Sequence, residues 1–273
     1  MIYERVYETG KGSIHYWTND HKDDKQTLVL LPGLTADHRL FEKQIEEFES
    51  DFNILSWDAP LHAASRPFDT DFSLMDKAVW LHEILEEESL KDPVLIGQSM
   101  GGYVSQCFIE KYPGEAAGFV SIDSAPIQRS YMSAAEVWLL KRTNWIYRPY
   151  PWNSLKKAAI KGCAETSYGR ELMRQFIETY TRDEYIDLAV HGYKILAEAI
   201  EASLSYEIDC PAIIICGRQD KAASTKRYNL AWTKKTGIPL FLIEGAGHNS
   251  NTDKPDDVNA LIHTFLDSLS VCK

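Results

Sequence analysis

A serine between two glycines is the first candidate for chemistry in this sequence. Residues 95–103 read "LIGQSMGGY", in which Ser99 stands between Gly97 and Gly101. An apolar run precedes the motif, and the helix-like "GYVSQCFIEKY" follows it. In a strand–Gly-x-Ser-x-Gly–helix turn, backbone strain raises the serine hydroxyl above the sheet, and side chains in place of the glycines would collide with neighbouring elements. Glycine and serine are also common in ordinary turns, so the motif alone does not identify a catalytic serine. A catalytic serine also needs a base, an acid and an anion site from the rest of the chain.

A base is needed because a serine hydroxyl is a poor nucleophile until its proton is removed as it attacks. The usual base is a histidine that a carboxylate holds in one tautomer. Of the eight histidines, His248 follows the apolar "PLFLIE" in the loop "GAGHNS", where Gly245 and Gly247 let the loop bend back over Ser99. A histidine in a polar loop is by default a surface residue, but this position and loop type favour His248 as the base.

The acid is predicted to be Asp220, which ends the segment "AIIICGRQD" and has Gly217 available for a tight turn. Asp123, in "SIDSAP", is the rival because it also ends an apolar run. Its flank leads directly into the next region of the chain, so we expect Asp123 to anchor the hinge of that region. Asp58, in "SWDAP", is expected to be a structural carboxylate that caps a turn.

Along nearly its whole length the chain resembles the α/β-hydrolase fold superfamily. "GQSMGG" resembles the nucleophile elbow of that family, "GRQD" its acid turn and "GAGH" its histidine loop, in the order serine, aspartate, histidine. The resemblance implies Ser99 as the nucleophile, His248 as base and then acid, and Asp220 as the carboxylate that orients the histidine. A serine at the first position differs from the haloalkane dehalogenases and epoxide hydrolases of this fold, which use a carboxylate there.

The resemblance also implies two backbone amides that stabilise a developing oxyanion. One is the amide of Met100, at the N-terminus of a helix whose dipole favours negative charge. The other belongs by position to Leu34 in "LLPGLTADH", where Pro32 replaces a frequent histidine and leaves the loop geometry open. Similarly, "PLHAASRP" replaces the family's glycine-rich turn, and His62 and Ser65 are expected to make hydrogen bonds within that turn.

No cofactor and no metal are predicted. The sequence has no HExxH motif and no cluster of cysteine and histidine at metal-ligand spacing. The glycine-rich "GKGS" lies between two strand-like segments and not before a helix, so it does not suit phosphate.

Alternating strand-like and helix-like segments must position these residues. A β-hairpin is predicted in "IYERVYETGKGSIHYWTND". Apolar strands are predicted in "TLVLLPG", "FNILSWDAP", the run before Ser99, "AGFVSIDSAP", "CPAIIICGRQD" and "IPLFLIEGAGH". Helices are predicted in "RLFEKQIEEFES" and near 73–88, 223–235 and 256–269. This order indicates an α/β fold with a mostly parallel sheet covered on both faces, whose ligands bind at the carboxyl ends of the strands.

The alternation stops between about 127 and 205, where four successive segments have helical spacing. We expect an all-helical cap at 127–205, inserted into an α/β-hydrolase core of residues 1–126 and 206–273. This segment contains many aromatic residues, including Trp138, Trp145, Tyr147, Tyr150, Trp152, Tyr168 and Tyr185. Most of them are expected to join the cap to the core, and one or two to line an apolar acyl pocket.

The composition is that of an ordinary globular protein of 273 residues, 44% hydrophobic and 25% charged. The net charge of -11 disfavours nucleic acid and an anionic membrane surface as partners and favours small neutral or apolar substrates. Five cysteines without a CxxC pair, Cys272 among them, indicate thiols of a reducing compartment. Neither a signal peptide nor a long apolar run is found, so a cytoplasmic protein is expected, of open oligomeric state.

Together these features predict a serine hydrolase that cleaves a small carboxylic ester, thioester or related acyl compound through an acyl-enzyme on Ser99. Other interpretations stay open. Some triad-bearing relatives of the fold cleave carbon–carbon bonds or act as lyases. A ligand sensor could keep the triad while acting through a protein partner, and a cofactor-free perhydrolase side activity is a third alternative. Turnover distinguishes the sensor, which would hydrolyse model esters very slowly and gain melting temperature with its ligand.

Overall fold

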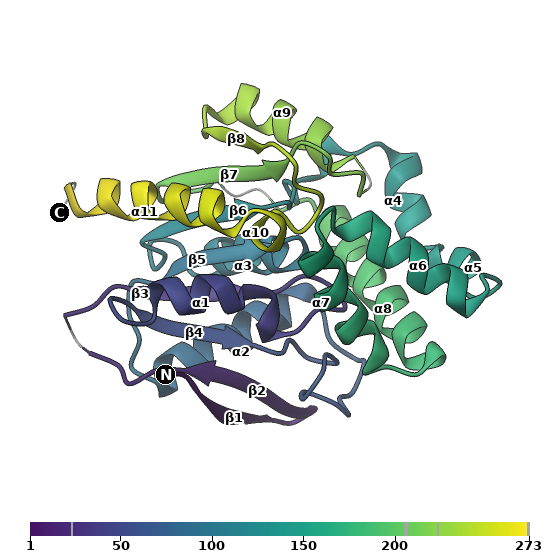
Figure 1. Cartoon of the computed structure of the whole chain (residues 1–273), viewed down its shortest axis with the longest axis horizontal. Coiled ribbons are helices and arrows are strands. Elements are labelled where there is room, and N and C mark those ends of the chain that lie inside the picture. The colour runs from purple at the N-terminus through teal and green to yellow at the C-terminus, as the bar shows by residue number, and fades with distance from the viewer. Residues whose placement is uncertain (23, 205–206, 223, 272–273) are drawn as a thin grey trace.

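An eight-stranded sheet forms the centre of the computed structural model, which describes residues 1–22, 24–204, 207–222 and 224–271 (Figure 1). The strands are β1 (Tyr3–Thr9), β2 (Gly12–Thr18), β3 (Thr27–Leu31), β4 (Asn53–Trp57), β5 (Val94–Gln98), β6 (Gly118–Ile122), β7 (Ala212–Gly217) and β8 (Leu240–Ile243). Their order is β1-β2-β4-β3-β5-β6-β7-β8. The predicted hairpin β1–β2 is antiparallel and β2 pairs antiparallel with β4, whereas all pairs from β4 to β8 are parallel.

Both faces of the central strands are buried, which explains why the strands are continuous apolar runs. Every residue of β3, β4, β5 and β6 is buried. In β3, Val29 and Leu31 pack into one core cluster, while Leu28 and Leu30 pack into the other. The first cluster contains residues of α2 (Leu74–Glu87), α3 (Met100–Lys111) and α9 (Thr225–Thr236), and the second contains residues of α1 (Glu42–Phe48) and α11 (Pro255–Val271). The predicted fold class, a mostly parallel sheet covered on both faces, is confirmed.

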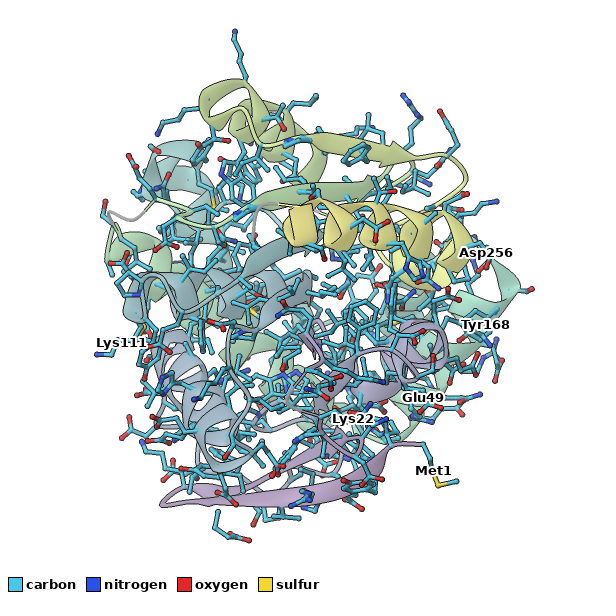
Figure 2. The ribbon with its side chains drawn as sticks, turned by 90° about the vertical axis from the view of Figure 1, so that its left-hand side faces the viewer. Met1, Lys22, Glu49, Lys111, Tyr168 and Asp256 are labelled. Carbon is cyan, nitrogen blue, oxygen red and sulfur yellow. The ribbon has the colours of Figure 1, made fainter. Side chains whose placement is uncertain are left out.

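Met1, which precedes the first strand, lies beside the residue that follows α1. The amino group of Met1 lies 2.9 Å from Oε2 of Glu49, just beyond the end of α1 (Figure 2). Because Met1 is almost fully exposed, this ion pair contributes little to stability.

Helices fill the chain between β6 and β7. They are the short 3-10 helix η2 (Arg129–Tyr131) and the α-helices α4 (Ala134–Leu140), α5 (Thr143–Tyr147), α6 (Trp152–Cys163), α7 (Ser167–Glu178) and α8 (Arg182–Glu201) (Figure 1). Residues 127–204 contain no strand among those the structure describes. Side chains of α7 and α8 enter the two core clusters, so this half of the insertion is well anchored.

The aromatic residues of the insertion behave in two ways. Tyr185 is buried, and the hydroxyl of Tyr168 donates a hydrogen bond to Glu42 of α1, so these two join the insertion to the core as expected. Trp138 and Trp145, in contrast, are 52% and 70% exposed, and Tyr150 is exposed as well. Trp138, Trp145 and Tyr150 therefore do not join the insertion to the core as expected, whereas Tyr147 and Trp152 are half-buried against the cluster that contains Tyr185.

Two sequence expectations concern the whole chain. Among the described helices, none has both the length and the apolar composition that crossing a bilayer requires. Cys107, Cys163, Cys210 and Cys216 are free thiols, and Cys272 lies outside the described residues.

Candidate active site

Ser99 occupies a sharp turn between β5 and α3, as the motif predicts. Its φ of 48° lies in the left-handed region that disfavours residues with a side chain. The flanking glycines are required because backbone atoms of neighbouring segments lie very close to them. A Cβ atom on Gly97 would lie 2.5 Å from the backbone of Gly101, and one on Gly101 would lie 1.9 Å from the carbonyl oxygen of Leu31. A larger residue at either position would push α3 away from the sheet.

The structure brings Ser99, His248 and Asp220 together from three different loops. Nε2 of His248 lies 2.9 Å from Oγ of Ser99, and Nδ1 lies 3.0 Å from Oδ2 of Asp220. Because an ionised carboxylate only accepts hydrogen bonds, Nδ1 of His248 carries a proton and donates a hydrogen bond to Asp220. Nε2 is then free to accept the hydroxyl proton of Ser99.

The side chain of Asp220, just after β7, is positioned by a backbone amide two residues further on and by His248. Its side chain is fully buried, and its second oxygen, Oδ1, accepts a hydrogen bond of 2.7 Å from the amide of Ala222. Gly217, expected to form a tight turn, serves another purpose. A Cβ atom there would lie 2.0 Å from the carbonyl oxygen of Gly247, so this glycine lets the acid strand approach the histidine loop.

The charge of Asp220 also sets the proton affinity of the histidine. Burial lowers the pKa of His248, but the charge and hydrogen bond of Asp220, together with the charge of Asp123, raise it by more. The net pKa lies above the ordinary histidine value of 6.5. Asp220 therefore stabilises the imidazolium ion that would form when His248 accepts a proton.

Asp123 lies at the same edge but does not contact the histidine ring. Its carboxylate accepts hydrogen bonds of 2.7 Å from the amides of Gly217 and Ser250, which belong to the acid strand and the histidine loop. The expectation that Asp123 anchors the hinge of the helical insertion is wrong, because both partners belong to the core. Burial, followed by the negative charge of Asp220, raises the pKa of Asp123 above the usual carboxyl range.

The two residues expected to supply oxyanion amides belong to segments that adjoin Ser99. Met100 is the first residue of α3, so its amide has no acceptor within the helix. A Cβ atom on Gly33 would lie 3.1 Å from Cβ of Ser99, which places the loop of Leu34 against the serine. The amide of Leu34 makes no hydrogen bond to any other residue in the described ranges. Both amides are thus available, and Pro32 does not displace this loop from Ser99.

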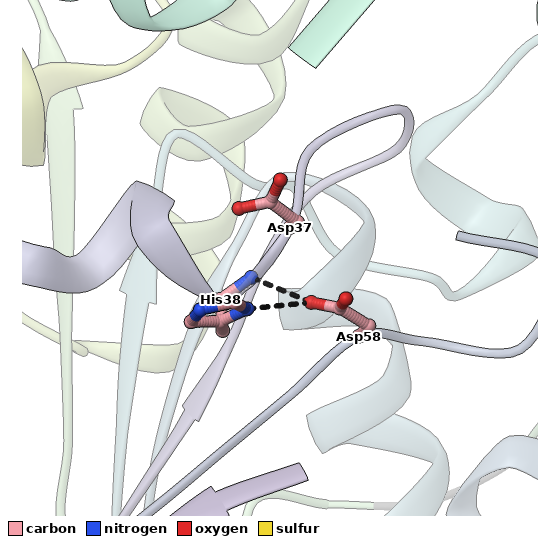
Figure 3. A group of neighbouring side chains, drawn as sticks. All are labelled: Asp37, His38 and Asp58. Atoms are coloured by element: carbon pink, nitrogen blue, oxygen red, sulfur yellow. Dashed lines mark hydrogen bonds and ion pairs between the residues drawn. The ribbon is translucent and has the colours of Figure 1, made fainter. Parts of the chain in front are cut away.

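An Asp–His–Asp group fastens the loop that carries Leu34. Oδ1 of Asp58 accepts hydrogen bonds of 2.9 Å from both the amide and Nδ1 of His38 (Figure 3). Oδ2 of Asp58 accepts a hydrogen bond of 2.9 Å from the amide of Ala64. Asp37 is bound by the guanidinium group of Arg39. These three side chains lie close enough to hold a metal ion, but N–H donors already occupy their carboxylates. Asp58 is the structural carboxylate that the sequence predicts.

The other group with metal-ligand spacing consists of Asp123, Cys216 and Asp220. The carboxylate oxygens of both aspartates accept hydrogen bonds from backbone amides or from His248. A metal ion there would have to displace the contacts that position the histidine, so these residues are better suited to hold His248 than a metal.

His62 and Ser65 make the turn contacts expected of them. Nδ1 of His62 lies 3.0 Å from the carbonyl oxygen of Pro60, and Oγ of Ser65 donates a hydrogen bond of 2.7 Å to the carbonyl of Asp58. Nε2 of His62 is buried without a partner in the described structure.

Two residues that the sequence interpretation missed hold the histidine loop. Nε2 of Gln98, next to the nucleophile, donates a hydrogen bond of 2.7 Å to the carbonyl of His248. Asp253 accepts hydrogen bonds from the amides of Gly247, Glu165 and Thr166, at 2.8, 2.9 and 2.9 Å, so one carboxylate joins the loop to the turn between α6 and α7. The only sequence signal for Gln98 is its place in the elbow, and Asp253 has no local signal.

Known proteins have sequences similar to this chain. Residues 26–255 match the family model described as "alpha/beta hydrolase fold". The (E)-2-((N-methylformamido)methylene)succinate hydrolase of Acinetobacter baylyi is 21% identical over 275 residues, which cover 98% of this chain and 99% of the relative. A 2-hydroxy-6-oxononadienedioate/2-hydroxy-6-oxononatrienedioate hydrolase of Klebsiella pneumoniae is 23% identical over 272 residues, or 95% and 93% of the two chains.

Solved structures agree on the fold. A thermophilic esterase from Thermogutta terrifontis, with malate bound, has a TM-score of 0.77 at 20% sequence identity, and the match covers 98% of this chain and 99% of the other. At this identity the likeness establishes the fold alone. The family model, however, covers most of the chain, including Ser99 and His248. The chain therefore belongs to the α/β-hydrolase fold family.

Proposed function

We propose that this protein is a serine hydrolase that cleaves a small carboxylic ester, thioester or related acyl compound. One observation carries the proposal: His248 lies between Oγ of Ser99 and the carboxylate of Asp220, at 2.9 and 3.0 Å. A serine, a histidine and a carboxylate in this order of contact suit nucleophilic acyl transfer.

The first half of the reaction forms the acyl-enzyme. Oγ of Ser99 attacks the carbonyl carbon while Nε2 of His248 takes the hydroxyl proton. The carbonyl oxygen becomes an oxyanion, which the amides of Leu34 and Met100 stabilise, helped by the N-terminal end of α3. The bond to the leaving group then breaks, and the leaving alcohol or thiol receives the proton from His248.

The second half releases the acid. Nε2 of His248 takes a proton from a water molecule, which attacks the acyl carbon and forms a second oxyanion in the same hole. The ester bond to Ser99 breaks, and the serine oxygen recovers its proton from His248. Asp220 stays ionised throughout, because its role is to hold the imidazole and stabilise the imidazolium ion.

The helical insertion is proposed to be a cap at 127–205 that limits the size of the substrate. Leu34 supports this role, because its side chain packs against Gly192 of α8, where a Cβ atom would lie 2.5 Å from Cδ1 of Leu34. Short acyl esters should then be better substrates than long triglycerides. Comparable turnover of both, with activation at an oil–water interface, would point to a lipase instead.

Labelling with a fluorophosphonate tests the nucleophile directly. The reagent should modify Ser99, as identified by mass spectrometry of the peptide that contains the elbow. Ser105→Ala, in the same helix, should keep the label, whereas Ser99→Ala should lose it. A panel of p-nitrophenyl esters of rising chain length then identifies the preferred acyl group. Absence of label on Ser99 in a folded protein with esterase activity would refute the proposal.

Hydrolysis of a carbon–carbon bond is the second candidate, and the full-length similarity to the 2-hydroxy-6-oxononadienedioate/2-hydroxy-6-oxononatrienedioate hydrolase favours it. The same residues would serve. Product analysis distinguishes the two reactions. Ester cleavage releases an alcohol and an acid, whereas hydrolytic carbon–carbon cleavage of a ketone releases an acid and a second compound that carries a new C–H bond.

A further inference from the structure

A lysine without a counter-ion is buried beneath the helical insertion. Lys77 lies in the first half of α2 and is 2% exposed. It makes no hydrogen bond and no ion pair with any residue that the structure describes, and the ring centroid of Phe72 lies 5.5 Å from its Nζ atom. Burying an ammonium group without an acceptor destabilises a protein, so a structural role alone does not explain this lysine.

Two histidines lie close to Lys77, and one of them, His191, contacts the same aromatic ring. His62 is 1% exposed, and its Nε2 atom has no partner in the described structure. His191, from α8, has its ring centroid 4.5 Å from that of Phe72, and its Nε2 atom lies 2.8 Å from a backbone carbonyl oxygen. We call Lys77, His62 and His191 the lysine–histidine cluster.

The pKa values of the cluster are set by burial and by the charge of Lys77. Burial lowers the pKa of Lys77 to about 7. Burial, and then the charge of Lys77, lowers the pKa of His62 to about 3 and that of His191 to about 4. No carboxylate in the described ranges contributes to the pKa of Lys77 or of His191. At neutral pH the cluster therefore contains two uncharged histidines and a lysine that an incoming anion would keep protonated, because an opposite charge favours the ammonium form.

The cluster lies at the edge of the sheet where Ser99 lies. β4, β3 and β5 are parallel, so the helices that follow β4 and β5 begin at the same edge, and α2 packs along α3. His191 is followed in α8 by Gly192, which contacts the side chain of Leu34. Leu34 also packs against the core cluster that contains Phe72 and Met100. The lysine–histidine cluster thus borders the apolar region next to the proposed oxyanion hole.

We propose that the lysine–histidine cluster binds a carboxylate carried by the acyl group of the substrate. The proposal rests on the proposed acyl transfer at Ser99 and narrows its substrate class to acyl compounds with a second, ionised carboxyl group. The ammonium group of Lys77 pairs with that carboxylate. Nε2 of His62, an acceptor while Nδ1 carries the proton, suits a hydroxyl group or a water molecule beside it. This replaces the expectation of a neutral or apolar acyl group.

Matched ester pairs test the proposal. The mono-p-nitrophenyl esters of succinate, glutarate and adipate are compared with the p-nitrophenyl esters of butanoate, pentanoate and hexanoate, which have the same chain lengths without the charge. At least one charged ester should exceed its neutral counterpart about tenfold in kcat/KM, mainly through a lower KM. Lys77→Met should bring that ratio to about one. Lys194→Met, which removes an exposed charge from α8, should leave the ratio unchanged.

A binding measurement separates this proposal from the proposed function. Glutarate should raise the melting temperature of the wild type, relative to chloride at equal ionic strength, and should not raise that of Lys77→Met. If no ester is hydrolysed but glutarate still stabilises the wild type through Lys77, acyl transfer fails and the carboxylate site stands. If esters are hydrolysed without a charged preference, or if Lys77→Met keeps that preference, the carboxylate site is refuted.

Discussion

The network around His248 and the lysine–histidine cluster both contain buried polar groups, but they use their hydrogen-bonding atoms differently. Three carboxylates around His248 each accept two or more hydrogen bonds: Asp123, Asp220 and Asp253. In the cluster, Lys77 has no acceptor and Nε2 of His62 no partner among the described residues. A network whose hydrogen-bonding groups all have partners within the protein fixes its side chains in place. A network with unpaired groups is suited to bind a ligand. Substitution of Asp220 should reduce turnover, substitution of Asp123 should mainly reduce stability, and substitution of Lys77 should change stability and substrate choice.

The largest effect is expected from Ser99→Ala. Loss of the nucleophile should reduce kcat by about 10⁴–10⁶, since the members of a triad act as a unit. The fold should stay intact, because alanine keeps the Cβ atom and the same backbone geometry. Hydrolysis of p-nitrophenyl acetate measures the first effect and circular dichroism the second. Near wild-type hydrolysis by the variant would show that another group is the nucleophile.

The next largest effect distinguishes Asp220 from Asp123 in the network around His248. Asp220→Asn should reduce turnover by about 10⁴, because His248 then loses its preferred tautomer. Asp123→Asn should have a much smaller effect on turnover, since the carboxylate of Asp123 contacts backbone amides and not the imidazole. It should instead lower stability by about 1–3 kcal/mol, because one of two buried amides loses its acceptor.

Both variants are assayed well below their melting temperatures, with stability measured by urea denaturation. The reverse ranking of turnover would assign the acid to Asp123.

Lys77→Met should stabilise the protein, in contrast to the substitutions around His248. Removing an unpaired buried charge should raise the free energy of unfolding at pH 7 by about 1–4 kcal/mol. The folded-state pKa of Lys77, about 7, lies below its ordinary value of 10.5. Between these values the unfolded chain holds a proton that the folded protein lacks, so wild-type stability rises with pH and its deficit relative to the variant shrinks.

Urea denaturation of both proteins from pH 7 to pH 10 measures this difference. Lys194→Met, with an exposed charge, should change stability by less than about 0.5 kcal/mol. A destabilised Lys77→Met would show that Lys77 has an internal partner and would remove the contrast between the two regions.

The smallest effect concerns the pH profile. A general base must be neutral, so kcat/KM should fall as pH decreases through the pKa of His248, at a value above 6.5. In Asp220→Asn only the charge of Asp123 still opposes the effect of burial on the pKa of His248, so the residual activity should fall at a lower pH than in the wild type. An unchanged midpoint would mean that Asp220 does not set the proton affinity of His248.

The sequence was sufficient to predict the sheet and the three residues that meet at its edge. Parallel strands buried on both faces leave continuous apolar runs, and the loops after them carry Ser99, Asp220 and His248 in short, specific motifs. The partners of Asp123 could not be predicted, because they lie 94 and 127 residues away and leave no local pattern. The same applies to Gln98, whose partner is 150 residues away.

Lys77 did have a local signal. The apolar spacing of Leu74, Ala78, Leu81 and Leu85 predicts the buried face of α2, and Lys77 lies three residues after Leu74 and four before Leu81, on that same face. A charged residue at a core position of an amphipathic helix contradicts the pattern around it. Such conflicts between local pattern and residue type are expected where a protein binds or reacts.

The carboxylate of Asp253 makes one cooperative unit of the histidine loop and the turn between α6 and α7. Separating that turn from the core would break the hydrogen bonds from Glu165 and Thr166 to the same side chain that binds the amide of Gly247. These three amide protons should therefore exchange with solvent deuterium at a common rate. Helices that move to admit substrate would then do so at the other end of the insertion, near α4 and α5, while the imidazole keeps its place.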